Sequence, residues 1–455
     1  MFAKINFHDE FYQKLKLLVL PITMQQFMLA LVSATDAIML GAVSQTSLSA
    51  VSLAGQIQFV LNLFISGISA GSGIMAAQYW GKKDAASIEE VMPIALRTNL
   101  IFSGAFTVFA AVAPEVLMRI FTSDPALIES GAVYLRAVSL SYLLCGISQI
   151  YLILLKNTGY ATVSSRISCT AVVVNIICNA ILIYGLFGLP ALGIQGAAYA
   201  TVAARLVELV WSYLETKQSG RVQIIWKKMF HAADAVLTKD FWRYTMPVLG
   251  AALVWGIAYV SYSVIMGHMG SDAVAANSIT TIAKNMLSCL IRGVSGGAGV
   301  LIGNLLGAGE LDKAKVYGGR LTRMAIVVGM TTGGLLMLIS PLIVRFAPLS
   351  ETAAEYLQYM LIFCGCNIMA QSVNTTVLDG IFCAGGDSKF DMKGNLGAMW
   401  CFSVPFGFFA AFVLKWPVMV VYCIVNLDEI VKIPAVYLHY KKYIWVRNIT
   451  VQEDA

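Results

Sequence analysis

The sequence predicts an all-α, polytopic membrane protein with twelve transmembrane helices, and three observations support this. First, 58% of the 455 residues are hydrophobic and only 12% are charged, whereas a soluble protein carries about 25% charged residues. Second, the charges lie between apolar runs long enough to cross about 30 Å of hydrocarbon. Third, the second half of the chain repeats the first. We therefore expect two pseudo-twofold-related bundles of six helices around a central cleft.

The apolar runs give the positions of the helices in chain order. We expect helical spans at residues 15–41, 51–79, 92–113, 132–155, 166–187, 193–214, 243–267, 275–305, 318–344, 353–382, 395–414 and 418–438. Several of the connections between them are very short, so successive helices should pack as antiparallel neighbours. The second and eighth spans are rich in glycine, which makes their ends less sharply defined.

Lys and Arg residues gather on one side of this predicted topology. They are frequent at the N-terminus, in the even-numbered loops and after the last span, and they are rare in the odd-numbered loops. Because cytoplasmic loops carry such an excess, we predict a multi-pass protein of the plasma (inner) membrane with both termini cytoplasmic. The N-terminus is not expected to be a cleavable signal peptide, since the apolar run after it is too long. The net charge of +6 follows the loops and forms no patch, so no nucleic-acid partner is expected.

The chain also contains an internal duplication. The longest polar connection, residues 216–242, separates an N-lobe (1–215) from a C-lobe (243–440) and a cytoplasmic tail (441–455). At a constant offset of 226 residues, Pro21 falls on Pro247 and "GISAGSG" at 67–73 falls on "GVSGGAG" at 293–299. Six spans per half is an even number, so the repeats must run parallel, related by an axis along the membrane normal. Two such bundles are typical of an alternating-access transporter.

Two motifs that resemble catalytic or metal-binding sites are better explained by packing. "GISAG" matches the GxSxG motif of a serine nucleophile, but that motif needs a strand–turn–helix context and a histidine, and all four histidines lie in loops or tails. Small residues at this spacing let transmembrane helices approach closely. The nine cysteines form no CxxC pair, so they are read as packing residues. No enzyme is predicted.

Several charged residues lie within the apolar spans. Arg205 with Glu208, and Asp428 with Lys432, have the spacing of neutralising pairs on one helix face. Asp379 has no such partner. The residues that we expect to line a substrate cleft are Gln56, Lys284, Arg292 and Asp379; for Lys284 and Arg292, extension of the side chain to the membrane surface is an equal alternative.

Asp36 is the single acid in the first span, and burying a charge there is costly. Asn175 and Asn179 stand four residues apart on one face of the fifth span, and Thr201 lies in the sixth. These oxygens could hold a hard cation such as Na⁺, and the same carboxylate could take a proton because desolvation favours its neutral form. The second half does not repeat this set, since Asp36 falls on Tyr262. A purely structural polar network is the alternative.

The segments "LPITMQQFMLALVSATDAIMLG", "ISAGSGIMAAQYWGKKD" and "GIQGAAYATVAARL", with the repeats "RGVSGGAGVLIGNLLGAGE" and "CAGGDSK", resemble the multidrug and toxic compound extrusion (MATE) family over nearly the whole chain. The resemblance implies a V-shaped pair of bundles that exports cationic or amphipathic drug-like molecules in exchange for H⁺ or Na⁺. We expect a monomer that needs no cofactor besides the coupling ion. A lipid-linked precursor flippase of a related fold is the alternative.

The same resemblance assigns roles to individual residues. The family's N-lobe cation site falls on Asp36, Asn175 and Thr201, and its fourth position, Asn179, is Asp in some members and Asn in others. Some members place a Glu in the seventh span; this chain has none there, so the sequence leaves open whether the C-lobe holds a second cation site. Pro21 matches the proline at which the first helix of the family bends.

Overall fold

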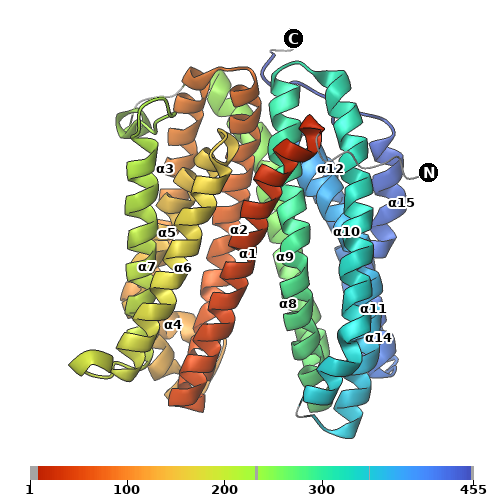
Figure 1. Ribbon diagram of the computed structural model, residues 1–455. Coiled ribbons are helices and arrows are strands. Elements are labelled where there is room, and N and C mark those ends of the chain that lie inside the picture. Colours follow the sequence, from red (N-terminus) through yellow and green to blue (C-terminus); the bar gives the residue numbers. More distant parts are fainter. Residues whose placement is uncertain (1–8, 231–233, 348, 452–455) are drawn as a thin grey trace. The chain divides into compact units, whose positions relative to one another are not determined.

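The computed structural model describes residues 9–230, 234–347 and 349–451, and this part of the chain is helical with no strand (Figure 1). Ten of its helical segments are long and apolar enough to cross a bilayer. They are α1 (Glu10–Val43), α2 (Gln45–Gly81), α3 (Ala85–Val112), α5 (Pro125–Asn157), α6 (Ala161–Tyr184), α8 (Ala235–Gly267), α9 (Ser271–Gly307), α10 (Leu311–Phe346), α11 with η3 (Glu351–Phe382), and α12 to η5 (Ser388–Val413).

The remaining helices are shorter or more polar. They are α4 (Pro114–Arg119), η1 (Leu186–Gly188), α7 (Ile194–Thr216), η2 (Trp226–Phe230), α14 (Val418–Val425) and α15 (Asp428–Tyr440). Each of the twelve predicted spans overlaps helical segments, and the all-helical fold class is confirmed. The predicted spans 353–382 and 395–414 also contain π-helical turns, at η3 (Thr376–Phe382), η4 (Leu396–Ser403) and η5 (Phe409–Val413), the last two separated by α13 (Val404–Phe408).

The prediction of one continuous helix over 418–438 is wrong. α14 ends at Val425 and α15 begins at Asp428, so the chain breaks at Asn426 and Leu427. The side-chain amide of Asn426 donates to the Tyr422 carbonyl, four residues earlier in α14. Asp428 then opens a new first turn, where an acidic side chain is favoured by the helix dipole.

By its contacts the chain forms two compact units. The N-terminal unit comprises residues 24–80 and 84–249, and the C-terminal unit comprises 1–23, 81–83 and 250–455. The first part of α1 therefore belongs to the C-terminal unit, and the first part of α8 belongs to the N-terminal unit. Both divisions fall two residues after a proline, Pro21 in α1 and Pro247 in α8.

The duplicated glycines explain how these helix segments pack. A Cβ on Gly67 would lie 2.8 Å from the Leu249 backbone, and a Cβ on Gly293 would overlap the Thr23 side chain. Both pairs are related by the 226-residue offset. One turn further, Gly71 lies against Thr245 as Gly297 lies against Val19. In the N-terminal unit the first part of α8 thus packs against the glycines of α2, and in the C-terminal unit the first part of α1 packs against the glycines of α9. Small residues are expected at such close helix contacts.

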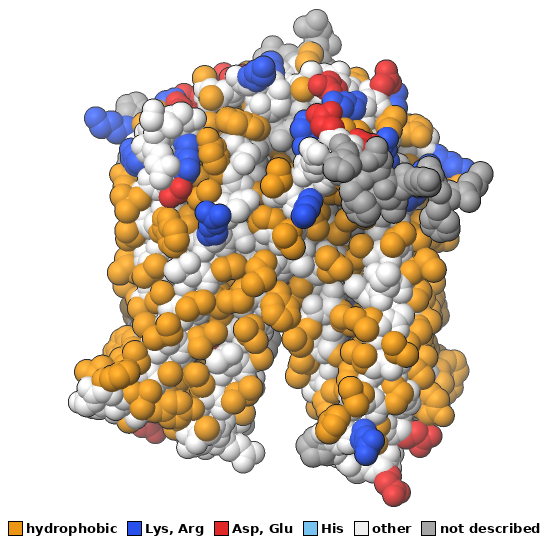
Figure 2. Space-filling view, viewed as in Figure 1, with side chains coloured by type: hydrophobic (Ala, Val, Ile, Leu, Met, Phe, Trp, Pro, Cys, Tyr) orange, Lys and Arg blue, Asp and Glu red, His pale blue; other side chains and the backbone are white. Residues whose placement is uncertain are grey.

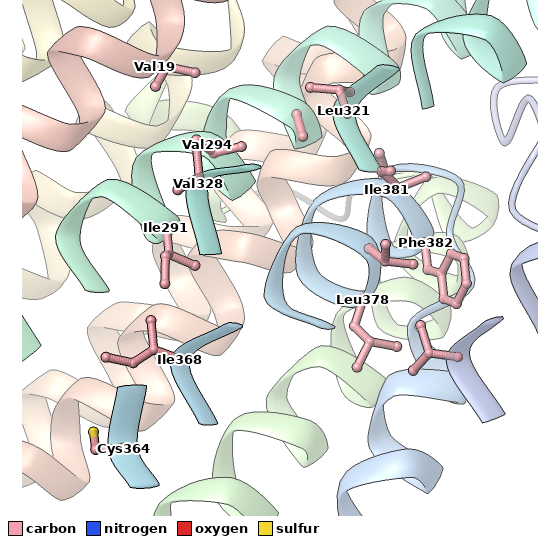
Figure 3. Packing of buried hydrophobic residues seen from close by; sticks show 14 of the residues in the cluster. Val19, Ile291, Val294, Leu321, Val328, Cys364, Ile368, Leu378, Ile381 and Phe382 are labelled. Atoms are coloured by element: carbon pink, nitrogen blue, oxygen red, sulfur yellow. The ribbon is translucent and has the colours of Figure 1, made fainter. Parts of the chain in front are cut away.

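The core of the C-terminal unit is apolar and continuous. Side chains of α9, α10, α11 and η3 interdigitate around Ile291, Val294, Leu321 and Phe382, and Val19 of α1 joins the same cluster (Figure 3). The chain end adds Trp445, which is fully buried. A Cβ on Gly385 would overlap the Trp445 backbone, so only glycine allows this approach. The predicted tail therefore begins as a packed segment of this unit.

Charged residues mark the ends of the helices, and apolar side chains cover most of their length (Figure 2). Asp9 shows how one end is fixed: its carboxylate accepts from the Phe11 backbone amide at 3.1 Å and from Arg320 at 2.6 Å. These two contacts hold the pKa of Asp9 below its usual value. The first satisfies an amide that the helix itself cannot pair, and the second ties the start of α1 to α10.

The close glycine contact in α2 can be tested against a matched glycine of the same helix. Gly71→Ala should lower the unfolding midpoint in detergent, because the new Cβ would lie 2.6 Å from the Thr245 backbone and overpacking costs about 1–3 kcal/mol. Gly55→Ala is the control, since nothing lies within 4 Å of its Cβ position. Equal midpoints for the two variants would contradict this account of the contact.

Candidate functional site

The candidate site of the N-terminal unit lies between α1 and α6, which run side by side in constant register. Gln25 donates to Ser168 at 2.8 Å, and Asn179 donates to Asp36 at 2.6 Å; in both pairs the partners are 143 residues apart. The Tyr184 hydroxyl closes the end of this contact by donating to the Met39 carbonyl. The register therefore sets Asp36 opposite Asn179.

The four predicted ion-site residues form one hydrogen-bonded chain. From Asp36 it runs through the Asn179 amide to the Asn175 oxygen at 3.0 Å, and the Asn175 amide reaches the Thr201 hydroxyl at 3.4 Å. Thr201 in turn donates to the Ala197 carbonyl. Asn175 and Asn179 meet because they are one helical turn apart on α6. Three helices, α1, α6 and α7, thus supply one carboxylate, two amides and a hydroxyl.

One acceptor in this chain has no donor. The side-chain oxygen of Asn179 is buried and receives no hydrogen bond, although the residue is only 1% exposed. A buried acceptor left unpaired costs about 1–3 kcal/mol. A proton on Asp36 or a small cation would supply the missing positive partner. The described part of the chain contains no group of three or more His, Cys, Asp and Glu side chains that could hold a metal ion, so any cation here would be bound mainly by neutral oxygens.

Sequence reasoning missed a fifth residue. The buried Tyr134 of α5 lies close enough to Asp36 for the carboxylate charge to act on its hydroxyl. A tyrosine in an apolar run gives no periodic signal that separates it from a packing residue, and so the sequence alone did not reveal its position.

A second polar contact fixes α7, the helix that carries Thr201. The Arg205 guanidinium contacts both oxygens of Glu208 at 3.0 Å, and Ser148 of α5 donates to the same carboxylate at 2.6 Å. Glu208 is 1% exposed. The predicted pairing is confirmed, and it ties α7 to α5 two turns from Thr201.

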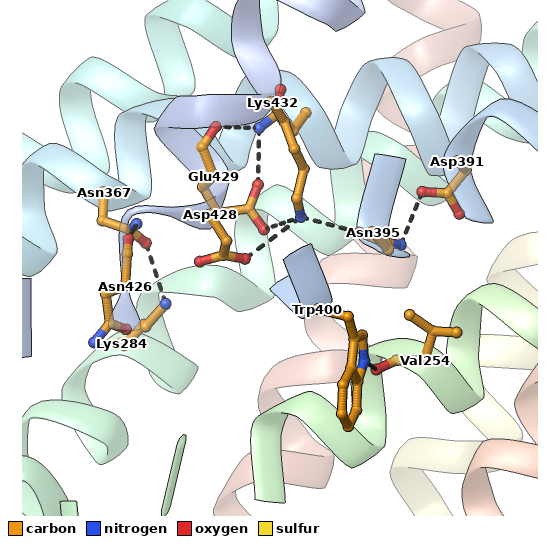
Figure 4. Close-up of polar contacts among 11 residues, drawn as sticks. Val254, Lys284, Asn367, Asp391, Asn395, Trp400, Asn426, Asp428, Glu429 and Lys432 are labelled. Atoms are coloured by element: carbon orange, nitrogen blue, oxygen red, sulfur yellow. Dashed lines mark hydrogen bonds and ion pairs between the residues drawn. The ribbon is translucent and has the colours of Figure 1, made fainter. Parts of the chain in front are cut away.

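The predicted cleft residues lie in different places. Gln56 of α2 and Arg292 of α9 are exposed, as is Asp379 in η3. Lys284 of α9 donates to the Asn367 side chain at 3.2 Å (Figure 4). The predicted pair of Asp428 and Lys432 is confirmed at 3.5 Å. It belongs to a larger network of the C-terminal unit that the sequence did not predict.

A duplicated set of six spans, with a partly buried carboxylate hydrogen-bonded to an amide of another helix, is typical of one class of protein, the membrane transporters built from parallel repeats. The comparison with known families agrees. The MatE family model matches residues 21–181 and again 247–409. The chain belongs to the MatE family, and it is a multi-pass membrane transporter and not an enzyme. The two matches begin 226 residues apart, at Pro21 and Pro247, which is the offset of the internal repeat.

Curated relatives are distant but cover most of the chain. An uncharacterized transporter of Bacillus subtilis, YisQ, is 22% identical over 91% of this chain and 90% of its own. A probable multidrug resistance protein NorM of Agrobacterium fabrum is 24% identical, over 76% of this chain and 73% of its own. Multidrug resistance protein MdtK of Yersinia enterocolitica is 25% identical, over 66% of each chain.

Solved structures share the fold. A MOP superfamily transporter from Pyrococcus furiosus, described as having a binding pocket of reversed polarity, superposes with a TM-score of 0.85 over 95% of both chains at 18% identity. A MATE structure in the straight conformation superposes with a TM-score of 0.85 over 95% of this chain and 96% of its own at 18% identity. One in the bent conformation scores 0.84 over 96% of both chains at 16% identity.

The ion pair on α7 gives a stability prediction. Glu208→Gln should lower the unfolding free energy by about 3 kcal/mol, the lower end of the range for a buried ion pair, because it leaves the partly buried Arg205 charge, whose side chain is 21% exposed, without its partner. The matched control is Glu115→Gln, which breaks the exposed Arg136–Glu115 pair and should cost no more than about 1 kcal/mol. Unfolding midpoints in the same detergent compare the two. Equal losses would show that burial of the pair on α7 contributes nothing.

Proposed function

We propose that this transporter is a secondary active antiporter that exports cationic or amphipathic small molecules in exchange for inward-moving H⁺ or Na⁺, with Asp36 as the coupling carboxylate. The observation that carries the proposal is the contact of Asp36 with Asn179, in a chain of side chains that lacks one positive partner. The names of the relatives NorM and MdtK support drug export as the activity. The distribution of Lys and Arg supports a plasma-membrane location with cytoplasmic termini, and we expect a monomer.

Coupling requires that ion and drug prefer different states of the protein. With Asp36 ionised, its negative charge favours a cationic drug. Once a proton or Na⁺ occupies the site, the charge of Asp36 is neutralised and its electrostatic attraction for the cationic drug becomes weaker. The same event changes what α1 contacts at Asn179, since a protonated carboxyl donates where the ionised form accepts. Drug and ion therefore compete for one charge.

Helix α1 is suited to carry this change along the chain. Asp36 lies in the part of α1 that packs in the N-terminal unit, and residues 10–23 pack in the C-terminal unit. Pro21 lies just before the division and has no N–H to donate within the helix, so bending there is less costly than elsewhere. Occupancy of Asp36 can thus act through one helix on both units.

The central test removes the charge and keeps the shape. Asp36→Asn should abolish efflux of a fluorescent lipophilic cation from proteoliposomes, because the site can then neither bind a proton nor supply a full charge to Na⁺. Glu129→Gln, an exposed acid at the start of α5, is the control and should transport normally. Full efflux by Asp36→Asn at equal protein level would remove Asp36 from the mechanism.

The coupling ion is identified by imposing the two gradients separately. Proteoliposomes of the unaltered chain should export the cation under one of the two inward gradients, pH or Na⁺, and that gradient names the coupling ion; Asp36→Asn should respond to neither. Transport of a lipid-linked oligosaccharide with no transport of the cation would favour the flippase alternative.

A further inference from the structure

The C-terminal unit contains a second buried polar network, on different helices from the Asp36 site. Lys432 of α15 lies at its centre: its ammonium group contacts Glu429 at 3.2 Å, Asp428 at 3.5 Å and the Asn395 oxygen at 3.0 Å (Figure 4). The Asn395 amide then donates to Asp391 of α12 at 3.1 Å. Asp391 and Lys432 are each 5% exposed, and Asp428 is 6% exposed.

The charges of this network do not balance. Asp391, Asp428 and Glu429 carry three negative charges when ionised, against the positive charge of Lys432 and that of Lys284, which acts on Asp428 and Glu429 from α9. Three acids against two lysines leave one net negative charge. Counting the more exposed Asp379 and Arg292, which also lie near the network, adds one charge of each sign and leaves the net charge unchanged. An uncompensated charge inside a membrane protein is expensive and points to function.

The hydrogen bonds show a matching deficit of one donor. The Asn374 amide, 2% exposed, donates to the Glu429 carboxylate at 2.8 Å and to the Glu429 carbonyl at 2.6 Å. The Asn374 oxygen is buried as well and has no donor. The network therefore lacks one positive charge, which a single proton would supply, and it separately leaves the Asn374 oxygen beside Glu429 without a donor.

A metal cation fits this network less well than a proton. The Lys432 ammonium already occupies the position between Glu429 and Asp428 where a cation would bind. The described residues also hold no cluster of three or more acidic, His or Cys side chains arranged for a metal ion. A proton needs no coordination shell, only a carboxylate whose negative charge is poorly compensated.

Asp391 is that carboxylate. Glu429 and Asp428 both contact the Lys432 ammonium, whereas Asp391 forms no ion pair with any described residue and accepts only from the neutral Asn395 amide among the side chains that contact it in Figure 4. The charged and titratable groups that face it come from η3, from the residue that follows η3, and from α15: Asp379, Cys383, Glu429 and Lys432.

We propose that the C-terminal unit binds one proton in this network, with Asp391 as its principal acceptor, independently of the Asp36 site. This extends the proposed function, because it gives the half of the chain that lacks an equivalent of Asp36 an ion-binding site of its own. It also proposes an answer to a question that the sequence leaves open, whether the C-lobe holds a second cation site.

The test uses the full chain carrying Asp36→Asn, so that the first site is removed. Infrared spectra are recorded at pH 6, where exposed carboxyls with ordinary pKa values of about 4 are ionised. Subtracting the spectrum of the Asp36→Asn, Asp391→Asn double variant from that of Asp36→Asn should leave a protonated-carboxyl band equivalent to one group per chain. Asp312→Asn in the same background is the control, because the Asp312 side chain is 99% exposed; its difference spectrum should contain carboxylate bands only.

Two outcomes would overturn the proposal. One is a carboxylate band in the Asp391 difference spectrum, which would mean that this group is ionised. The other is loss of the protonated-carboxyl band in Glu429→Gln while it persists in Asp391→Asn. If Asp391→Asn does not elute as a folded protein, Asp391→Glu keeps the carboxyl and should shift the band in frequency; an unshifted band would also overturn the assignment. Because Asp36 is absent throughout, these results do not depend on whether Asp36 couples transport.

Discussion

A carboxylate at membrane depth needs a partner inside the protein, and in this chain the Asn179 amide is the partner of Asp36, 2.6 Å away. Lipid offers no hydrogen bonds, so every buried polar group must be satisfied by the protein. This constraint explains why two asparagines and a threonine occupy positions where apolar side chains would pack more easily. It also explains why α1 keeps a fixed register on α6, since a shift of one residue would separate the carboxylate from the amide.

The internal duplication places the same constraint on packing in both halves. Gly67 with Leu249 and Gly293 with Thr23 are equivalent contacts at the 226-residue offset, and each brings two helix backbones closer than a Cβ would allow. Each first helix packs in the other unit up to two residues after its proline and in its own unit after that. The glycines hold the first parts of α1 and α8 in these contacts.

The sequence predicted the helices and the first site because both leave local signals. Apolar runs gave the spans, and the isolated Asp36 together with the Asn175 and Asn179 spacing gave a polar set that the structure brings into contact. It failed where the signal is not local. Asn426 and Leu427 lie within a mostly apolar run, and at the break between α14 and α15 the Asn426 carbonyl accepts from the side chain of Asn367 in α11, a partner that only the folded chain provides. Tyr134 and Asp391 were missed for the same reason, since their meaning depends on neighbours from distant helices.

The two halves have kept their packing but not their polar groups. The glycine contacts recur because any side chain at those positions would collide with a neighbouring helix, so the geometry alone restricts them. Buried polar groups are not required by packing, and each is costly within the membrane. Such a group therefore persists where it has a function or a partner. In the first half the side-chain partner of Asp36 is the neutral Asn179 amide, and the structure gives the carboxylate no ion pair with a described residue. In the second half Lys432 already neutralises much of the acidic charge, which leaves room for a proton and little for a metal ion. Divergence after duplication has thus given the two units different buried polar groups on the same helical framework.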